Sequence, residues 1–295
     1  MIIFNSAQKL KNHLNGIRSQ GKTIGFAPTM GALHKGHISL ISTAKAQCDV
    51  VVCSIFVNPT QFNDLSDLDK YPRTLEADIV LLESANCDIL FAPEISEIYS
   101  EQEINAKKNN VEDKTWMVGK TVDFGLLDKV MEGALRPGHF NGVAQVVSKL
   151  FRIVEPNKSF FGQKDFQQLT IIKSMVRQLE MPIEIVACPI VRESDGLAMS
   201  SRNTRLTKDD RKRVPFIFKT LSYIVDTYKD STINELLEEV ELEFSIDDFM
   251  KLEYLEIVDA ETLQPIDDLE TATSAVACIA VKLSNVRLID NIILF

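Results

Sequence analysis

The sequence lacks any apolar run long enough to cross a membrane. No stretch of about 18 uninterrupted apolar residues occurs, so we expect no membrane-spanning helix. The first five residues, Met-Ile-Ile-Phe-Asn, also lack the charged region and the long apolar core of a secretion signal. These two absences predict a cytoplasmic protein with no membrane partner.

Basic charge is scarce as well. The chain has 32 lysines and arginines against 42 aspartates and glutamates, which gives a net charge of −10. A nucleic-acid-binding protein needs a basic face for the phosphate backbone, so this balance argues against a nucleic-acid partner. It does not argue against a nucleotide enzyme, because a small local cluster of Lys, His and Arg is enough to hold a triphosphate.

Cysteines are few and are not arranged for metal binding or cross-linking. Their number is odd and their spacing fits neither zinc ligands nor a disulfide framework. Most lie in apolar runs typical of strands, which predicts buried, reduced thiols in a cytoplasm. They are Cys48, Cys53, Cys87, Cys188 and Cys278.

What the sequence does contain is an alternation of strand and helix signals over its first two-thirds. Strands are predicted at 22–27, 49–57, 88–92, 158–161 and 183–187, and helices at 36–47, 72–84, 141–154 and 165–179. Near-continuous apolar strands are typical of a parallel sheet covered on both faces. The alternation therefore predicts an α/β fold with a Rossmann-like, doubly wound parallel sheet.

The pattern changes after about Val191. Two charged helices are predicted at 207–228 and 233–244, followed by strands at 254–258 and 274–283. We therefore expect a Rossmann-like domain at 1–190 and a smaller α+β lid domain at 191–295. The segment 192–205, rich in Ser, Arg and Gly, is a plausible hinge, and the polar segment 100–123 is predicted to be an irregular surface excursion.

The histidine loop, residues 28–37, follows a predicted strand and opens a predicted helix. It holds His34 and His37 together with Gly31 and Gly36. Backbone N–H groups at a helix N-terminus bind phosphate, and each imidazole can add a donor. A metal site is disfavoured because no nearby carboxylate or Cys offers a third ligand, whereas a helix-capping or core role for one histidine stays open.

Two further clusters carry cations that suit a phosphate. Lys164 stands at a predicted helix start, where the dipole prefers anions, and this misfit favours an anionic partner; a surface ion pair with Asp165 is the alternative. The segment 197–203 offers hydroxyls and a guanidinium that could clamp phosphate, or it is a solvated loop. The basic run 211–213 is interpreted as a solvated helix face. Loops after parallel strands meet at one sheet edge, so these clusters should converge.

Together the histidine loop and the late Met-Ser-Ser-Arg segment resemble the HIGH and KMSKS elements of the nucleotidyltransferase superfamily. Within it, motifs along essentially the whole chain resemble, in order, those of pantothenate synthetases (pantoate–β-alanine ligases). They lie at 28–37, 56–62, 71–73, 132–133, 136–140, 161–169, 194–203 and 287–291. Two features depart from the family pattern: Gln163 stands where a Glu is usual, and the segment 100–123 is longer.

The resemblance implies a two-step ligase that joins pantoate to β-alanine through a pantoyl adenylate and releases pyrophosphate and AMP. It implies catalytic roles for His37, as proton donor, His34 and Lys164. Gln61 and Gln168 match pantoate positions, and Gln61 also reaches toward β-alanine. It further implies Mg²⁺ on the phosphates with few or no fixed protein ligands, and a homodimer. The implied ATP-binding positions are Met30, Gly31, Ala32, Leu33, His34, Lys35, Gly36, His37, Gly162, Gln163, Lys164, Asp165, Val191, Met199, Ser200, Ser201 and Arg202.

Two other functions remain as alternatives. One is another nucleotidyltransferase that stops at the nucleotide adduct, against which the paired glutamines and the Gly-Gln-Lys-Asp cluster argue. The other is a non-catalytic nucleotide sensor that has kept the fold.

Overall fold

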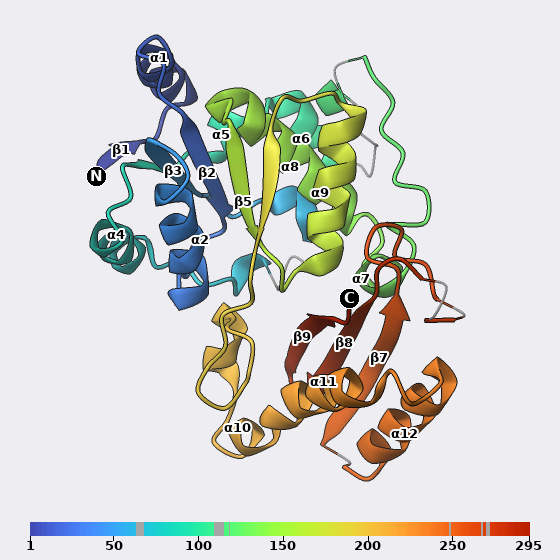
Figure 1. Cartoon of the computed structure of the whole chain (residues 1–295). Helices are drawn as coiled ribbons and strands as arrows, with labels where there is room; N and C mark the ends of the chain where they lie inside the picture. Colours follow the sequence, from blue (N-terminus) through green and yellow to red (C-terminus); the bar gives the residue numbers. More distant parts are fainter. Residues whose placement is uncertain (63–67, 109–114, 118, 248, 267, 270–271) are drawn as a thin grey trace.

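A computed structural model describes residues 1–62, 68–108, 115–117, 119–247, 249–266, 268–269 and 272–295. Its larger sheet has six strands, all parallel, in the order β1-β4-β3-β2-β5-β6 (Figure 1). The parallel sheet confirms the predicted fold class. Its strands are β1 (Ile2–Phe4), β2 (Ile24–Thr29), β3 (Val50–Ile55), β4 (Ile89–Phe91), β5 (Lys158–Gly162) and β6 (Glu184–Cys188).

Helices cover both faces of this sheet, because its central strands are apolar on both sides. One face packs against α1 (Ala7–Arg18), α8 (His139–Val154) and α9 (Phe166–Gln178). The other face packs against α2 (Lys35–Lys45) and α4 (Leu75–Ser84). Such doubly wound sheets bind ligands beyond the carboxyl ends of their strands. Within the described residues, no helix has the length and apolar character needed to traverse a bilayer.

The segment at 100–123 is not the irregular surface excursion that its polarity predicts. It contains α6 (Glu101–Lys108) and the short 3-10 turn η2 (Thr115–Met117). Trp116, Met117 and Val122 are buried and pack into the main core, so apolar side chains anchor the segment. Residues 109–114 and 118 lie outside the described residues. The short helices α5 (Ile95–Ile98) and α7 (Met131–Leu135) flank this region.

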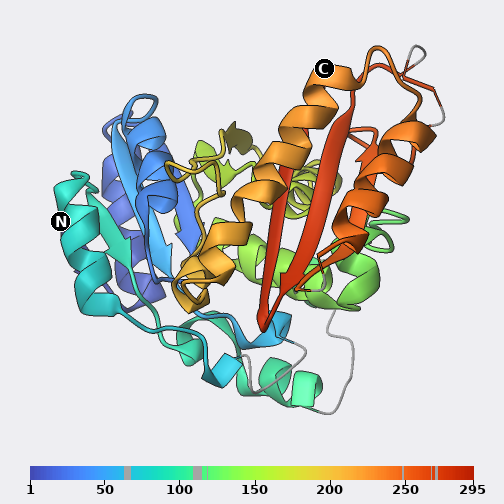
Figure 2. The same cartoon turned by 90° about the horizontal axis from the view of Figure 1, so that it is seen from below.

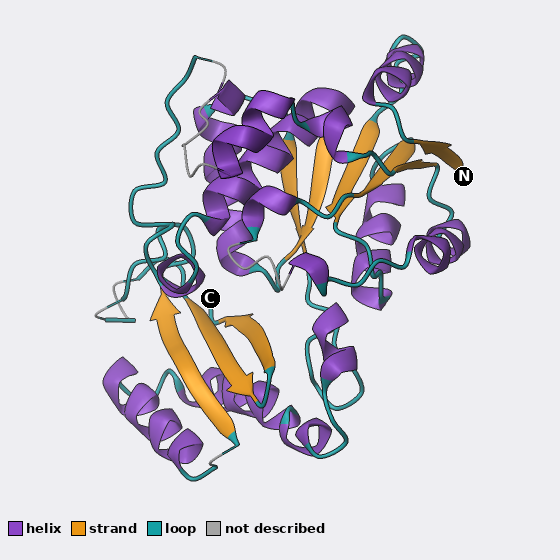
Figure 3. Ribbon diagram, turned by 180° about the vertical axis from the view of Figure 1, so that it is seen from behind, coloured by secondary structure: helices purple, strands orange, loops and turns teal. Residues whose placement is uncertain are grey.

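The C-terminal part forms a separate, smaller antiparallel sheet in the order β7-β8-β9. Its strands are β7 (Met250–Val258), β8 (Val276–Leu283) and β9 (Val286–Ile293). The helices α11 (Pro215–Thr227) and α12 (Ile233–Ser245) pack on one face around their own apolar cluster (Figure 2). The sheet lies toward the carboxyl ends of the parallel strands (Figure 3).

One expectation for this part needs correction, and three elements of the chain were not expected. The single helix expected at 207–228 is split into α10 (Asp210–Arg213) and α11, with Pro215 at the first turn of the second helix. A proline removes an N–H donor, so it is tolerated at a helix start and not in its interior. The strand β9 was not expected, and neither were β1 and α1. The domain boundary after residue 190 stays a prediction.

Candidate active site

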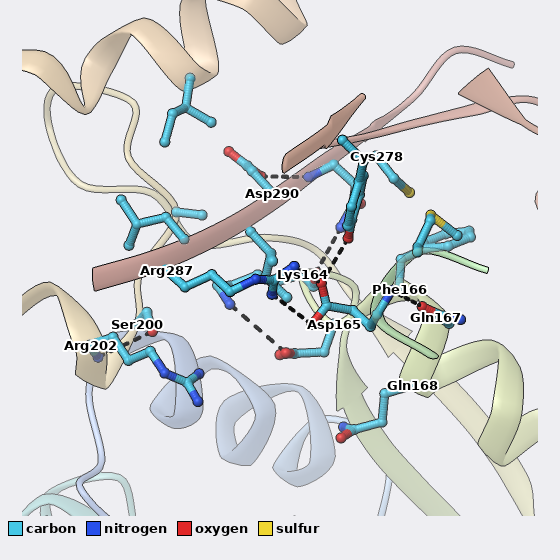
Figure 4. A pocket seen from close by; sticks show the side chains of 18 of the residues that line it. Lys164, Asp165, Phe166, Gln167, Gln168, Ser200, Arg202, Cys278, Arg287 and Asp290 are labelled. Atoms are coloured by element: carbon cyan, nitrogen blue, oxygen red, sulfur yellow. Dashed lines mark hydrogen bonds and ion pairs between the residues drawn. The ribbon is translucent and has the colours of Figure 1, made fainter. Parts of the chain in front are cut away.

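Two adjoining cavities lie beyond the carboxyl ends of the parallel strands, and the second also reaches the C-terminal sheet. The histidine cavity, about 220 Å³, is lined by the histidine loop, α8 and the segments 189–191 and 199–202. The basic cavity, about 260 Å³, is lined by α7, the start of α9 and the strand β9 (Figure 4). Both cavities are lined by Lys164, Asp165, Gln168, Ser200 and Arg202, so the predicted cationic clusters do converge.

A buried carboxylate shapes the first half of the histidine loop. Asp78 on α4 is 1% exposed and accepts hydrogen bonds from the backbone N–H groups of Ala32 (3.0 Å) and Leu33 (2.7 Å). Gly31 has a φ of 83°, and a Cβ there would lie 3.1 Å from an Asp78 oxygen, so only glycine fits without strain. These two N–H groups therefore face Asp78 and not the cavity, so other groups of the loop have to provide its contacts with a phosphate.

The two loop histidines hold each other in a defined tautomer. His34 caps α2 by accepting a hydrogen bond at Nδ1 from the Gly36 N–H (3.1 Å), and His37 Nδ1 accepts one from the His34 N–H (3.3 Å). In a neutral ring the proton then resides on Nε2, so both rings offer an Nε2–H donor. The capping role and a place in the cavity wall thus coexist in His34.

Both histidines are neutral at physiological pH. Burial first, and then the neighbouring His34 and Lys164 by charge repulsion, lower the pKa of His37 to about 3. Burial, followed by Lys164, also lowers the pKa of His34. The site consequently meets an anion with two neutral histidine donors beside the side chains of Lys164 and Arg202.

Lys164 does not form a tight surface ion pair with its neighbour. Its side chain is 16% exposed, its Nζ is 3.9 Å from the Asp165 carboxylate, and that carboxylate is 50% exposed. A separation of 3.9 Å is beyond hydrogen-bonding distance. The ammonium therefore faces the shared region of the two cavities, as an anion-binding role requires.

A buried polar network orients Gln61, which also lines the histidine cavity. Asn58, 1% exposed, donates from Nδ2 to the Gln61 side-chain oxygen (3.1 Å) and accepts at Oδ1 from the Tyr99 hydroxyl (2.9 Å). His139 donates from Nδ1 to the Gln61 main-chain carbonyl (2.9 Å), and burial lowers its pKa to about 4. Because the Gln61 oxygen is occupied, its amide NH₂ is left as the group that a substrate meets.

The segment that carries Ser200 and Arg202 is held by ion pairs. Arg211 reaches Glu193 (2.6 Å) and Asp195 (2.8 Å), and Asn203 donates to Glu193 (2.7 Å). The interpretation of 211–213 as a solvated helix face is thus wrong for Arg211. Ser201–Arg205 forms the 3-10 turn η3. This segment therefore has a defined local structure and is not a loose solvated loop.

The basic cavity is bordered by a charged cluster that joins the helix α7 to the C-terminal sheet. Arg287 on β9 pairs with Glu132 on α7 (2.6 Å) and with Glu253 on β7. Tyr254 donates its hydroxyl to Glu132 (2.9 Å). Burial, and then the Glu132 charge, raise the pKa of Tyr254 far above its ordinary range, so this phenol stays a donor.

Most of the predicted site residues line the histidine cavity. Those that do are Met30, His34, Gly36, His37, Gln61, Gly162, Lys164, Asp165, Gln168, Val191, Met199, Ser200, Ser201 and Arg202. Five others line neither cavity, namely Gly31, Ala32, Leu33, Lys35 and Gln163. Leu33 packs into the core beside α2, and Gln163 contacts Asn291 on β9. Sequence reasoning did not assign roles to Asp78, Asn58, His139 or Asn291, whose partners lie far away along the chain.

The fold and the site together define a class. A parallel sheet whose carboxyl edge brings a paired-histidine loop to a lysine and a Ser-Ser-Arg segment is a nucleotide-binding α/β protein of the nucleotidyltransferase type. A family model described as pantoate-beta-alanine ligase matches residues 2–293. The chain belongs to this family.

Individual relatives agree along the whole chain. It is 49% identical over 292 residues to the pantothenate synthetase of Porphyromonas gingivalis and 50% identical over 293 residues to that of Phocaeicola vulgatus, with 99% of each chain covered. The pantothenate synthetase structure from Thermus thermophilus matches with a TM-score of 0.88 and 38% identity, covering both chains completely. The Francisella tularensis pantoate-beta-alanine ligase, complexed with beta-gamma ATP and beta-alanine, matches with a TM-score of 0.75 and 35% identity, covering 99% of this chain and 97% of its own.

Proposed function

We propose that this chain is an AMP-forming ligase that condenses pantoate with β-alanine to pantothenate through a pantoyl adenylate. The observation that carries the proposal is the make-up of the histidine cavity. Neutral histidine donors, Lys164 and the Ser200–Arg202 segment line this cavity together with two glutamine amides. The histidines and cations suit a triphosphate, and the amides suit a small polyol carboxylate.

The first step is adenylation. A pantoate carboxylate oxygen attacks the α-phosphorus of ATP, a new O–P bond forms, and the bond to pyrophosphate breaks. Two anions meet in this step and charge develops on the phosphoryl oxygens, so positioning and electrostatic stabilisation supply most of the catalysis. Lys164 would hold the α-phosphate, while Ser200, Ser201 and Arg202 would hold the β,γ end and neutralise the leaving pyrophosphate.

The histidines act first as neutral donors to phosphate oxygens. A bound triphosphate raises the pKa of a nearby histidine. For His37, whose pKa is about 3 in the free protein, protonation would place a hydrogen on Nδ1, which accepts the hydrogen bond from the His34 N–H. We therefore propose that His37 stays neutral and acts on the leaving pyrophosphate as a hydrogen-bond donor through its Nε2–H.

We place pantoate beside the two glutamines of the histidine cavity. Gln61 and Gln168 line this cavity together with Val143, Val147 and Met30. Neutral amides can bond hydroxyl and carboxylate groups without adding a charge that would weaken the nucleophile, and the apolar wall suits the methyl groups of pantoate. The Gln61 NH₂ comes within 3.0 Å of the Met30 sulfur, a weak acceptor that a substrate oxygen would replace.

The second step is attack by the β-alanine amine on the acyl carbon, which releases AMP. The amine must reach the adenylate from outside the nucleotide, and the basic cavity opens beside Lys164 and Gln168. We infer that β-alanine enters there, since the arginines that line it attract a carboxylate. Hydrolysis of the adenylate has to be suppressed, so the C-terminal part, residues 191–295, would close as a lid.

Mg²⁺ would accompany ATP. It prefers hard oxygen ligands and usually bridges phosphate oxygens with one or two carboxylates and water. The half-exposed Asp165 carboxylate, beside Lys164 in both cavities, fits such an ion as a direct or water-mediated ligand. The metal would screen phosphate charge. We further propose that the protein is a cytoplasmic homodimer, as its resemblance to the family implies.

Two assays test this function. Purified protein incubated with ATP, Mg²⁺, pantoate and β-alanine should yield AMP and pantothenate, identified by mass. Pyrophosphate should exchange into ATP when pantoate is present and β-alanine is absent. Binding of ATP without either product would favour the nucleotide sensor, and activity on a phosphorylated substrate without exchange would favour another nucleotidyltransferase.

A further inference from the structure

The strand β9 brings two buried polar residues to the cationic segments of the histidine cavity. Asp290 and Asn291 are 4% and 1% exposed. Figure 4 shows Asp290 on this strand, close to the loop that carries Lys164. Burial of two polar side chains carries a large desolvation cost unless each is fully hydrogen-bonded, so their partners identify what they hold in place.

Asn291 holds the backbone of the Lys164 loop. Its Nδ2 donates to the main-chain carbonyls of Gln163 (3.0 Å) and Lys164 (2.9 Å), and its Oδ1 accepts from the Gln163 side-chain amide (3.2 Å). Both N–H groups and the oxygen of the Asn291 side-chain amide are therefore hydrogen-bonded to two adjacent residues, Gln163 and Lys164. The backbone from which the Lys164 side chain extends is fixed by a residue of the C-terminal sheet.

Asp290 holds the other cationic segment. Its carboxylate binds the Arg192 guanidinium at 2.5 and 3.1 Å, and Arg192 also donates to the Gly196 carbonyl (3.0 Å). Arg192 stacks on Phe218 at 4.0 Å. The segment beyond it folds back, since the Met199 N–H donates to the Val191 carbonyl (2.9 Å), and it leads directly to Ser200.

We propose that Asp290 and Asn291 are positioning residues for adenylation: one dipeptide of β9 fixes the spacing between Lys164 and the Ser200–Arg202 segment. Adenylation needs the α-phosphate and the leaving pyrophosphate to be held at once, and misplacement of either by about 1 Å can cost about a hundred-fold in rate. The inference rests on the proposed function. It assigns a catalytic consequence to a contact between the two sheets.

The variant Asn291→Asp tests it, because carboxylate oxygens would face the two carbonyls that now accept hydrogen bonds. The turnover of pantoate-dependent pyrophosphate exchange should fall by roughly ten- to hundred-fold, with the KM for pantoate unchanged. Asp290→Asn, which weakens the Arg192 pair, should show the same selective loss. Asn234→Asp, at an exposed position of α12, adds the same charge as Asn291→Asp. This variant should catalyse pyrophosphate exchange at the rate of the parent protein.

A purely structural role gives a different pattern. In that case the variants would unfold at lower temperature while exchange per folded molecule stayed within about twofold of the parent, and the inference would be overturned. Should Asn291→Asp not fold, Asp290→Asn alone decides between these results. Absence of exchange in the parent protein would overturn the proposed function itself, and the inference with it.

Discussion

Gly142 on α8 is the residue whose substitution bears most directly on the pantoate end of the site. A Cβ added there would lie 2.7 Å from the Thr60 carbonyl oxygen and 2.8 and 2.9 Å from the Gln61 Cα and N. These are backbone atoms of the short turn η1 (Pro59–Gln61), so no side-chain rotation can relieve the contact. Ordinary van der Waals contact begins at 3.4 Å, and the turn would have to retreat by about 0.7 Å.

We therefore expect Gly142→Ala to do two things. Overpacking of this kind typically costs about 1–3 kcal/mol, and the helix-propensity gain of roughly 0.5–1 kcal/mol leaves a net loss of up to about 2.5 kcal/mol in the free energy of unfolding. Displacement of Gln61 should raise the KM for pantoate about ten-fold and leave the KM for ATP unchanged. Urea unfolding and pyrophosphate exchange at varied pantoate measure both effects.

The matched control is Gly16→Ala on α1. This glycine is exposed in a helix and an added Cβ would meet nothing within 4 Å. It should stabilise the protein by roughly 0.5–1 kcal/mol with unchanged kinetics. The reasoning is refuted if Gly142→Ala behaves like Gly16→Ala, stabilised and with an unaltered pantoate KM.

Three other outcomes are expected. The pKa of His139 is about 4 in the fold against about 6.5 unfolded, so its stabilising effect is complete above pH 6.5 and is lost as the pH falls. Between pH 7 and pH 5 the free energy of unfolding, measured with urea, should fall by about 2 kcal/mol less for His139→Gln than for the parent. Equal decreases in the two proteins would contradict the assignment. Lys164→Ala should lower pyrophosphate exchange at least roughly a hundred-fold, while Lys173→Ala, exposed on the helix α9 that follows Lys164, leaves it intact; similar rates for both would remove Lys164 from the mechanism. Glu132→Ala leaves Arg287 without one of its two carboxylates and should cost roughly 2–3 kcal/mol, whereas a change under about 0.5 kcal/mol in urea unfolding would mark the pair as an ordinary surface contact.

The inner strands and the main helices could be predicted because their signal is local. β3 is a nearly continuous apolar run, and α2, α8 and α9 have regular apolar spacing. The edge strand β1 could not be predicted, because it has only three residues and two of them, Ile2 and Ile3, are about half exposed. β9 was missed because charged residues that face the site interrupt its apolar pattern.

The site divides in the same way. The histidine loop and Lys164 were found from short motifs whose chemistry is readable without the fold. Asp78 acts on a loop 45 and 46 residues away, and Asn291 acts on one 127 and 128 residues away. Nothing in the neighbouring sequence of either residue indicates its partner, because the contact arises only when the chain has folded.

The central claim is that the pantoate carboxylate attacks the α-phosphorus of ATP. Pantoate labelled with oxygen-18 in its carboxylate, incubated with the protein, ATP, Mg²⁺ and β-alanine, tests it in one measurement. The account predicts that one labelled oxygen appears in AMP, because the carboxylate oxygen that forms the O–P bond leaves with the nucleotide. Pantothenate formed with no label in AMP would contradict an adenylate intermediate.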